Sequence, residues 1–194
     1  MRCALNHQNA GSIPVDFGST AVTGIHCRIV EALRNYYGLA PRPVKIVDAF
    51  QMLGEIDAEL AEKIGVDCIG IGGPKDIFDL DTTRMHEQTT PWGQRVLVPE
   101  AMDLTPDMRG DVYVYAGGDQ NYPPSAVMPK GCYFINAIER QQPIEEDRLD
   151  PEDNVEQFGI LKENDLAYYC AEADKAYQTG RAVVASFGGT ALGD

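Results

Sequence analysis

The chain has 194 residues, of which 44% are hydrophobic, and it carries a formal net charge of −14 at pH 7. This length and apolar content suffice for one ordinary globular core, and they exclude disordered, collagen-like and coiled-coil proteins. A surface this negative repels phosphate backbones and anionic lipids, so we expect neither a nucleic acid nor a membrane as partner.

The cysteines and the apolar segments of the sequence indicate the cellular compartment of the protein. The five cysteines are far apart and include no CxxC pair, which indicates neither a disulfide framework nor a compact zinc site. The N-terminus lacks the long apolar run of a signal peptide, and no stretch approaches the ~20 apolar residues of a membrane span. We therefore expect a cytoplasmic protein.

The first elements in chain order are a strand and a helix. Residues 13–18 form a short apolar run bounded by turn formers, as in a strand. Residues 22–36 carry apolar side chains at helical spacing along one stripe, and Gly38 is placed to end that helix.

A second helical region is predicted over 46–64, with its apolar residues on one face. Gly54 and Asp57 suggest that it breaks into two pieces, and Gly65 ends it. Residues 66–73 then predict a buried strand made mostly of apolar residues and glycine.

The stretch from 90 to 137 changes character, because short β runs alternate there with turns that contain proline and glycine. We predict a small antiparallel meander inserted into the chain. His86, which precedes it, is expected in a polar, solvent-facing loop. The strands of the meander are expected at 96–98, 111–115, 125–128 and 132–135.

An acidic run over 145–156 follows and is typical of a solvated loop. Asn164 can cap an amphipathic helix, and Gly180 is placed to close it. Residues 182–187 predict a third buried strand.

This order of elements predicts an α/β fold with a parallel sheet and right-handed crossovers. The last residues, 188–194, form a strand-to-helix loop with no helix after it. Because three parallel strands leave an open edge and a closed barrel takes ~250 residues, we expect an incomplete barrel. The alternative is a compact three-stranded α/β domain that ends naturally.

Polar residues near the strand ends are the candidates for chemistry. Asp16 can bind a polar group of a substrate, act as an acid or base, or cap the following helix. Ser19 and Thr20 fit either helix caps or substrate ligands. His26 and Cys27 are adjacent, and neighbouring helix residues point about 100° apart, so they do not easily share a metal ion.

Three groups of segments occur in a recognisable order. The first pairs Ala-Leu-Asn-His at 4–7 with Ile-Pro-Val-Asp-Phe-Gly-Ser-Thr at 13–20, and the second is Ala-Glu-Lys-Ile-Gly-Val-Asp-Cys-Ile at 61–69. The third runs from Tyr-Pro-Pro at 122–124 through Gly-Cys-Tyr-Phe at 131–134 to Ala-Ser-Phe-Gly-Gly-Thr at 185–190. Together they resemble the uroporphyrinogen decarboxylase superfamily, in its branch found in anaerobes beside corrinoid methyltransferases.

The resemblance implies the N-terminal portion of a (β/α)8 TIM-type barrel with an inserted small antiparallel β meander. Residues 1–89 would hold the first βα units, 90–137 the meander, and 138–194 the acidic loop, the helix and the third barrel strand of one incomplete domain. Such barrels place their site at the C-terminal ends of the strands, which makes Asp16 the expected catalytic residue. The expected substrate-binding residues are Ser19, Thr20, Gly72, Gly73, Asp76, Ser186, Gly188, Gly189 and Thr190.

The sequence also departs from the family pattern. True uroporphyrinogen decarboxylases carry an arginine-rich loop after the first strand and an aspartate just after the second. Here the loop at 18–24 has no arginine, and no carboxylate follows the second predicted strand before Asp76. A polyanionic tetrapyrrole would be held poorly, so we expect a corrinoid-dependent methyltransferase-like enzyme. The alternatives are a decarboxylase of a carboxylated ring, supported by Asp76, and a non-catalytic binding module that needs a partner.

The methyltransferase branch uses zinc to activate a thiol and moves a methyl group between that thiol and a corrinoid cobalt. Its zinc ligands belong to the second half of the barrel, so no cofactor is expected within this chain. The corrinoid would belong to a partner protein. The missing half of the barrel or a second copy of the chain would complete the sheet, and we expect this chain alone to be inactive.

Overall fold

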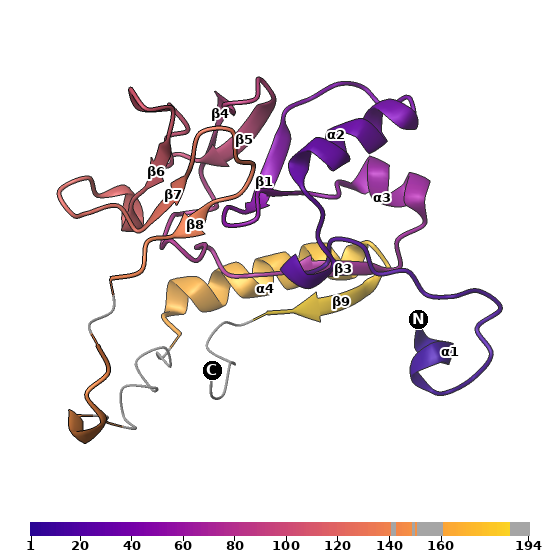
Figure 1. Cartoon of the computed structure of the whole chain (residues 1–194). Coiled ribbons are helices and arrows are strands. Elements are labelled where there is room, and N and C mark those ends of the chain that lie inside the picture. Colours follow the sequence, from indigo (N-terminus) through magenta and orange to yellow (C-terminus); the bar gives the residue numbers. More distant parts are fainter. Residues whose placement is uncertain (141–142, 149, 151–160, 187–194) are drawn as a thin grey trace.

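The computed structural model describes residues 1–140, 143–148, 150 and 161–186, which form a mixed α/β arrangement with several sheets and no closed barrel (Figure 1). The helices are α1 (Arg2–Leu5), α2 (Cys27–Tyr36), α3 (Ala58–Ile64) and α4 (Glu163–Gln178), with 3-10 turns η1 (Ala21–Thr23), η2 (Ala116–Gly118) and η3 (Glu146–Arg148). The strands are β1 (Val44–Asp48), β2 (Leu53–Gly54), β3 (Cys68–Ile71), β4 (Met85–Thr89), β5 (Arg95–Pro99), β6 (Val112–Val114), β7 (Ala126–Met128), β8 (Asn136–Ala137) and β9 (Ala182–Ala185).

Two of the sheets lie with α2 and α3 in one half of the molecule. A four-stranded mixed sheet has the order β2-β1-β5-β4, in which β1 and β5 are parallel and Val44 lies opposite Val96. A three-stranded antiparallel sheet has the order β6-β7-β8. Figure 1 shows both sheets above α4, with α2 and α3 beside β1.

One hydrophobic core joins these two sheets to α2 and α3. Alternate residues of β1, β5, β6 and β7 are buried, as the two-residue period of a strand requires when one face is covered. α2 adds Cys27 and Val30, neither of which has any exposed surface. The largest side chains with almost no exposed surface are Met52, Leu60, Leu80, Leu104, Met128 and Ile135.

The third sheet consists of β3 and β9, which are parallel and lie against α4 (Figure 1). Cys68 is opposite Ala182, and Ile71 is opposite Ala185. The helix buries Tyr169 and Ala176. Among the described strands β9 pairs with β3 alone, so its other edge is open.

The expectation of helix over the first part of 46–64 is wrong, because β1 occupies 44–48. Val44, Ile46 and Val47 are β-branched and fit a strand, with Val44 and Ile46 buried on one face. The apolar residues of β1 and of the turn after it happen to be three to four residues apart, and this spacing resembled one face of a helix. The second part is helical, as α3: Asp57 accepts hydrogen bonds from the backbone N–H of Glu59 and Leu60, and Gly65 ends the helix at φ 81°.

The strand expected at 13–18 is also absent from the structure. Pro14 lacks a backbone N–H, and the N–H of Val15 donates to the side chain of Asp67 instead of to a ladder carbonyl, at 2.8 Å. The following helix begins later than expected, at Cys27, because 21–23 form a separate 3-10 turn before Gly24.

Several smaller expectations need correction. His86 lies in β4, where Glu87 pairs with Leu97 of β5, so it is not in a polar loop. β5 joins β1 and β4, which limits the antiparallel meander to β6, β7 and β8. Residues 132–135 are not a strand, and pairing resumes at β8. The first residue of α4 follows Lys162, so Asn164 lies inside the helix and does not cap it.

Other expectations are confirmed. α4 and β3 occur where the sequence predicted them, and Gly38 and Gly180 follow helices with positive φ angles of 67° and 70°. β9 also lies in the predicted segment, but the expectation that it is buried is wrong, because its residues alternate between partly buried and exposed. Within the described residues, no helix is long and apolar enough to cross a membrane.

Candidate functional site at the carboxyl ends of the parallel strands

The carboxyl ends of β3 and β9 lie side by side because the two strands are parallel and in register. The N–H of Ser186 donates to the carbonyl of Ile71 at 2.9 Å, directly after both strands end. Gly72 and Gly73 leave β3 at this same edge. Ligands of parallel α/β sheets bind at the carboxyl edge, so this edge is the candidate functional site.

The segment 15–19 runs beside β3 in the same direction. The N–H of Asp67 donates to the carbonyl of Val15 at 2.8 Å, near the start of β3. Further along, the carbonyl of Ser19 approaches Gly70 so closely that a Cβ on Gly70 would lie 1.6 Å from the oxygen. Glycine at 70 is therefore what allows the chain to bring Asp16 and Ser19 to β3.

Asp16 is half-buried and braces a local turn. Its Oδ2 accepts a hydrogen bond from the hydroxyl of Ser19 at 2.7 Å, and its Oδ1 accepts one from the N–H of Ser19 at 3.3 Å. A carboxylate has about four acceptor positions, so the two oxygens can each accept another hydrogen bond from a ligand. Thr20 precedes η1 without capping it through its side chain.

Tyr169 of α4 belongs to this edge, although the sequence marked it only as part of an apolar helix face. Its hydroxyl donates to the carbonyl of Ser186 at 3.5 Å, and a Cβ on Gly73 would lie 2.9 Å from the hydroxyl oxygen. Burial, and then the charge of Asp165, raises the pKa of Tyr169. Helical periodicity predicted that the ring faces inward, but no local signal could show which strand end its hydroxyl reaches.

Asp76 lies five residues beyond β3 and braces its own loop. Its Oδ1 accepts hydrogen bonds from the N–H groups of Phe78 and Leu80 at 2.9 and 3.0 Å. Its Oδ2 is buried and has no hydrogen-bond partner among the residues that the structure describes. Burial raises the pKa of Asp76, although both amides act in the opposite direction, and the charge of Asp48 adds to the rise. Gly188, Gly189 and Thr190 lie outside the described residues.

Carboxylates outnumber cations around these loops. Lys75, which follows Gly73 by two residues, binds Asp79 at 2.6 Å, and that hydrogen bond raises the pKa of Lys75. Asp16 and Asp76 carry no ion pair with a described residue to offset their charge. The edge therefore suits a neutral or cationic group better than a polycarboxylate.

The buried cysteines add no reactive thiol, and the histidines add no metal site, to the described part of the chain. Burial raises the pKa of Cys27 to about 12 and also raises that of Cys68, so neither thiol ionises readily. The ring of His26 accepts from the N–H of Arg28 and lies 3.0 Å from the carbonyl of Tyr133. Within the residues that the structure describes, no three His, Cys, Asp or Glu side chains are grouped to hold a metal ion.

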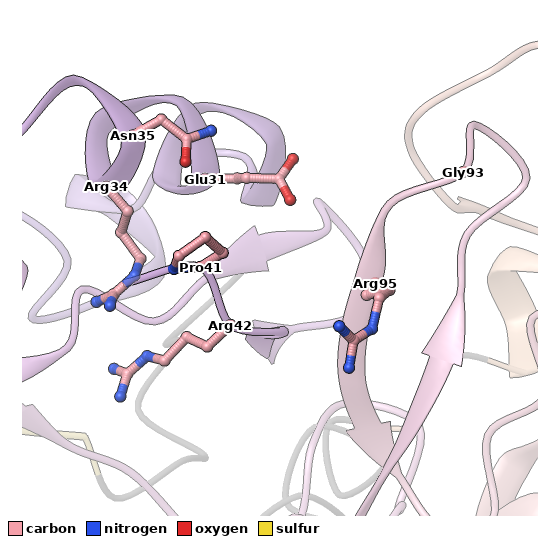
Figure 2. Close-up of a pocket in the computed structure, with 7 residues that line it drawn as sticks. All are labelled: Glu31, Arg34, Asn35, Pro41, Arg42, Gly93 and Arg95. Atoms are coloured by element: carbon pink, nitrogen blue, oxygen red, sulfur yellow. The ribbon is translucent and has the colours of Figure 1, made fainter. Parts of the chain in front are cut away.

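A cavity lies elsewhere, between α2 and the turn joining β4 to β5 (Figure 2). Comparisons of the chain with protein-family models, with curated proteins and with solved structures find no match.

Proposed function

We propose that this chain forms the first βα units of a (β/α)8 barrel in a methyltransferase-like enzyme of the uroporphyrinogen decarboxylase superfamily, with its site at the carboxyl ends of β3 and β9. The observation that carries the proposal is the shared direction of 15–19, β3 and β9. Gly73 and Ser186 come together at the carboxyl ends of β3 and β9, beside the hydroxyl of Tyr169. Ser19, whose hydroxyl holds the carboxylate of Asp16, lies next to Gly70 of β3. In a barrel of this type the catalytic residues come from the ends of several strands.

The open edge of β9 supports the view that further strands complete this sheet. A two-stranded sheet is marginal in water, and an unpaired edge exposes a row of backbone N–H and C=O groups. Val183 of β9 is 41% exposed, which is unusual for a strand of a barrel covered by helices. A longer polypeptide or a partner chain would supply the missing strands, and activity would belong to that complete assembly.

Asp16 is the residue proposed to contact the substrate. Its carboxylate can accept a hydrogen bond from a substrate hydroxyl, amine or amide, while the Ser19 hydroxyl fixes its orientation. Gly72, where a Cβ would meet nothing within 4 Å, lets a ligand approach the backbone closely. The described residues do not fit a zinc site, so no step is assigned to zinc, and the corrinoid enters as a substrate carried by a partner protein.

A decarboxylase of a carboxylated ring is the second candidate. The buried Oδ2 of Asp76, which has no partner within the described part of the chain, and the raised pKa of this carboxyl favour it, because a protonated carboxyl can donate a hydrogen bond to a ring substituent. The excess of carboxylates at the same edge weighs against a carboxylated substrate. A binding module that needs a partner would share the open β9 edge but would leave Asp16 without a chemical role.

Methyl transfer is the direct test. The complete polypeptide that carries this chain would be given methylcobalamin and a small thiol, and the demethylated corrinoid would be followed by absorbance. In this reaction the methyl group passes from cobalt to sulfur, the bonding electron pair stays on cobalt, and the thiol proton goes to solvent. We expect Asp16→Asn to lower the rate by roughly tenfold or more, the range in which a substrate-positioning group contributes.

Asp174→Asn is the matched control, because Asp174 is an exposed aspartate on α4 away from the strand ends. It should leave the rate unchanged. Absence of methyl transfer together with release of carbon dioxide from a ring carboxylate would favour the decarboxylase. Equal rates for Asp16→Asn and the unmodified protein would refute the proposed site.

A further inference from the structure

The cavity between α2 and the β4–β5 turn has a volume of about 270 Å³. Small-molecule sites usually span roughly 300–1,000 Å³, so this cavity suits a metabolite of about the size of an amino acid. Figure 2 shows Glu31 and Arg34 reaching it from α2, Arg42 from the segment before β1, and Arg95 from β5. Three of its seven lining residues are arginines, on a chain with 16 basic and 30 acidic residues.

The inner wall is rigid. Arg34 is 3% exposed, its Nη1 pairs with Asp57, and its Nη2 donates to Glu59 and to the carbonyl of Ala40, both at 2.9 Å. Nη2 of Arg42 binds the same Asp57 carboxylate at 2.7 Å. The Nε of Arg34 is buried and has no acceptor among the described residues.

Two guanidinium groups keep donors for a ligand. Arg42 is 46% exposed at its side chain and uses one nitrogen for Asp57. Arg95 is 63% exposed and binds Glu87 through Nε and Nη2, at 2.6 and 2.9 Å, which leaves Nη1 unused. Guanidinium groups carry five N–H donors in a planar fork, so Arg42 and Arg95 can each still bind a carboxylate.

Glu31 provides the opposite charge in the same cavity. It is half-buried and forms no ion pair or hydrogen bond with the residues that the structure describes. Figure 2 shows its carboxylate projecting from α2 into the open space, across from the guanidinium of Arg95. A simple anion would meet repulsion from Glu31, whereas an ammonium group would give this carboxylate a partner.

We propose that this cavity binds a dicarboxylic α-amino acid, with its ammonium group on Glu31 and its two carboxylates on Arg42 and Arg95. Two cations and one anion around an amino-acid-sized space complement two carboxylates and one ammonium. The site lies apart from the carboxyl ends of β3 and β9, and it does not depend on the function proposed for them.

The test compares L-glutamate with glutarate, which lacks only the amino group. Each would be titrated into the full chain by isothermal calorimetry at low salt. We expect glutamate to bind and glutarate to bind at least ~tenfold more weakly, which corresponds to about 1.4 kcal/mol. Glutarate binding as tightly as glutamate would mean an anion site without amine recognition, and no heat from either at millimolar concentration would also overturn the proposal.

Two variants locate the contacts. Glu31→Gln should weaken glutamate binding by roughly tenfold and leave glutarate binding unchanged or tighter, because only the amine contact is lost. Arg95→Gln should weaken both ligands, since both use its guanidinium. Each side chain is at the surface, so thermal unfolding should show both variants folded. Glutamate affinity unaffected by either substitution would place binding somewhere else and refute the assignment.

Discussion

Gly70 and Gly72 are two positions apart, yet their surroundings differ completely. A Cβ at Gly70 would collide with the backbone oxygen of Ser19, whereas a Cβ at Gly72 would meet nothing within 4 Å. Neither glycine has the positive φ angle that disfavours other residues. The close approach of 15–19 to β3 therefore makes Gly70 irreplaceable, while Gly72 tolerates a methyl group.

Gly70→Ala should lower the free energy of unfolding by about 3 kcal/mol or more, because the obstructing atom is backbone and the strand or the segment must move. Gly72→Ala should change it by less than about 1 kcal/mol and could raise it by restricting the unfolded chain. Urea denaturation of both variants measures the difference. Equal effects for the two substitutions would contradict the packing of 15–19 against β3.

At the scale of elements, Asp57 joins α2, α3 and the segment before β1. Its Oδ1 caps α3, and its Oδ2 pairs with Arg34 of α2 and with Arg42. Burial by itself would raise the pKa of Asp57, but the Leu60 amide and the two guanidinium groups outweigh it and lower the pKa below its usual value. A buried carboxylate held by a cap and two cations fixes how the two helices meet.

The lowered pKa sets the direction of a pH effect. Because the folded pKa is below the unfolded one, the contribution of Asp57 is fully present above about pH 4 and is lost as the pH falls through the folded value. Asp57→Asn should cost ~3–5 kcal/mol at pH 7, since it leaves Arg34 buried without its main partner, and it should flatten the loss of stability between about pH 5 and pH 2.

Glu59→Gln is the matched control, because Glu59 contacts the same Arg34 but is 59% exposed. Its cost should stay below ~1 kcal/mol with little change in the acid profile. Urea denaturation across the pH range separates the two variants. A Glu59 effect as large as that of Asp57 would show that the buried pair is not what holds the helices together.

At the scale of the whole molecule, the residues divide between two packing regions. The main core draws on α2, α3, β1, β5, β6 and β7, and it includes no residue of β3, β9 or α4. Among the described residues, the β3–β9 sheet and α4 bury only three hydrophobic side chains, those of Cys68, Tyr169 and Ala176. A region with less buried apolar surface opens at a lower free energy than the core.

Two buried thiols report on the two regions. Cys27 lies in the main core and Cys68 in β3, and both are free cysteines. In a background with serine at the exposed positions 3, 132 and 170, an alkylating reagent should modify Cys68 faster than Cys27 under native conditions. Mass spectrometry at timed intervals follows both sites. Equal rates would indicate that the chain opens as one unit.

Short-range features of the sequence determined the elements that end at a residue with a distinct conformational preference. Gly38, Gly65 and Gly180 end helices with positive φ because glycine adopts that conformation without strain. The apolar runs at β3 and β9 predicted buried strands, and their parallel arrangement followed from the intervening elements. These features depend on residues that are close together in the chain, so they can be predicted from the sequence alone.

The tertiary structure decided whatever depends on residues far apart in the chain. β1 became a strand because β5, about fifty residues on, pairs with it, which overrode a helical spacing pattern. The hydroxyl of Tyr169 meets Gly73, and Glu31 faces Arg95 across a cavity, through contacts that no local spacing encodes. Composition and periodicity report which face of an element is apolar, but the partner that covers it is set by long-range packing.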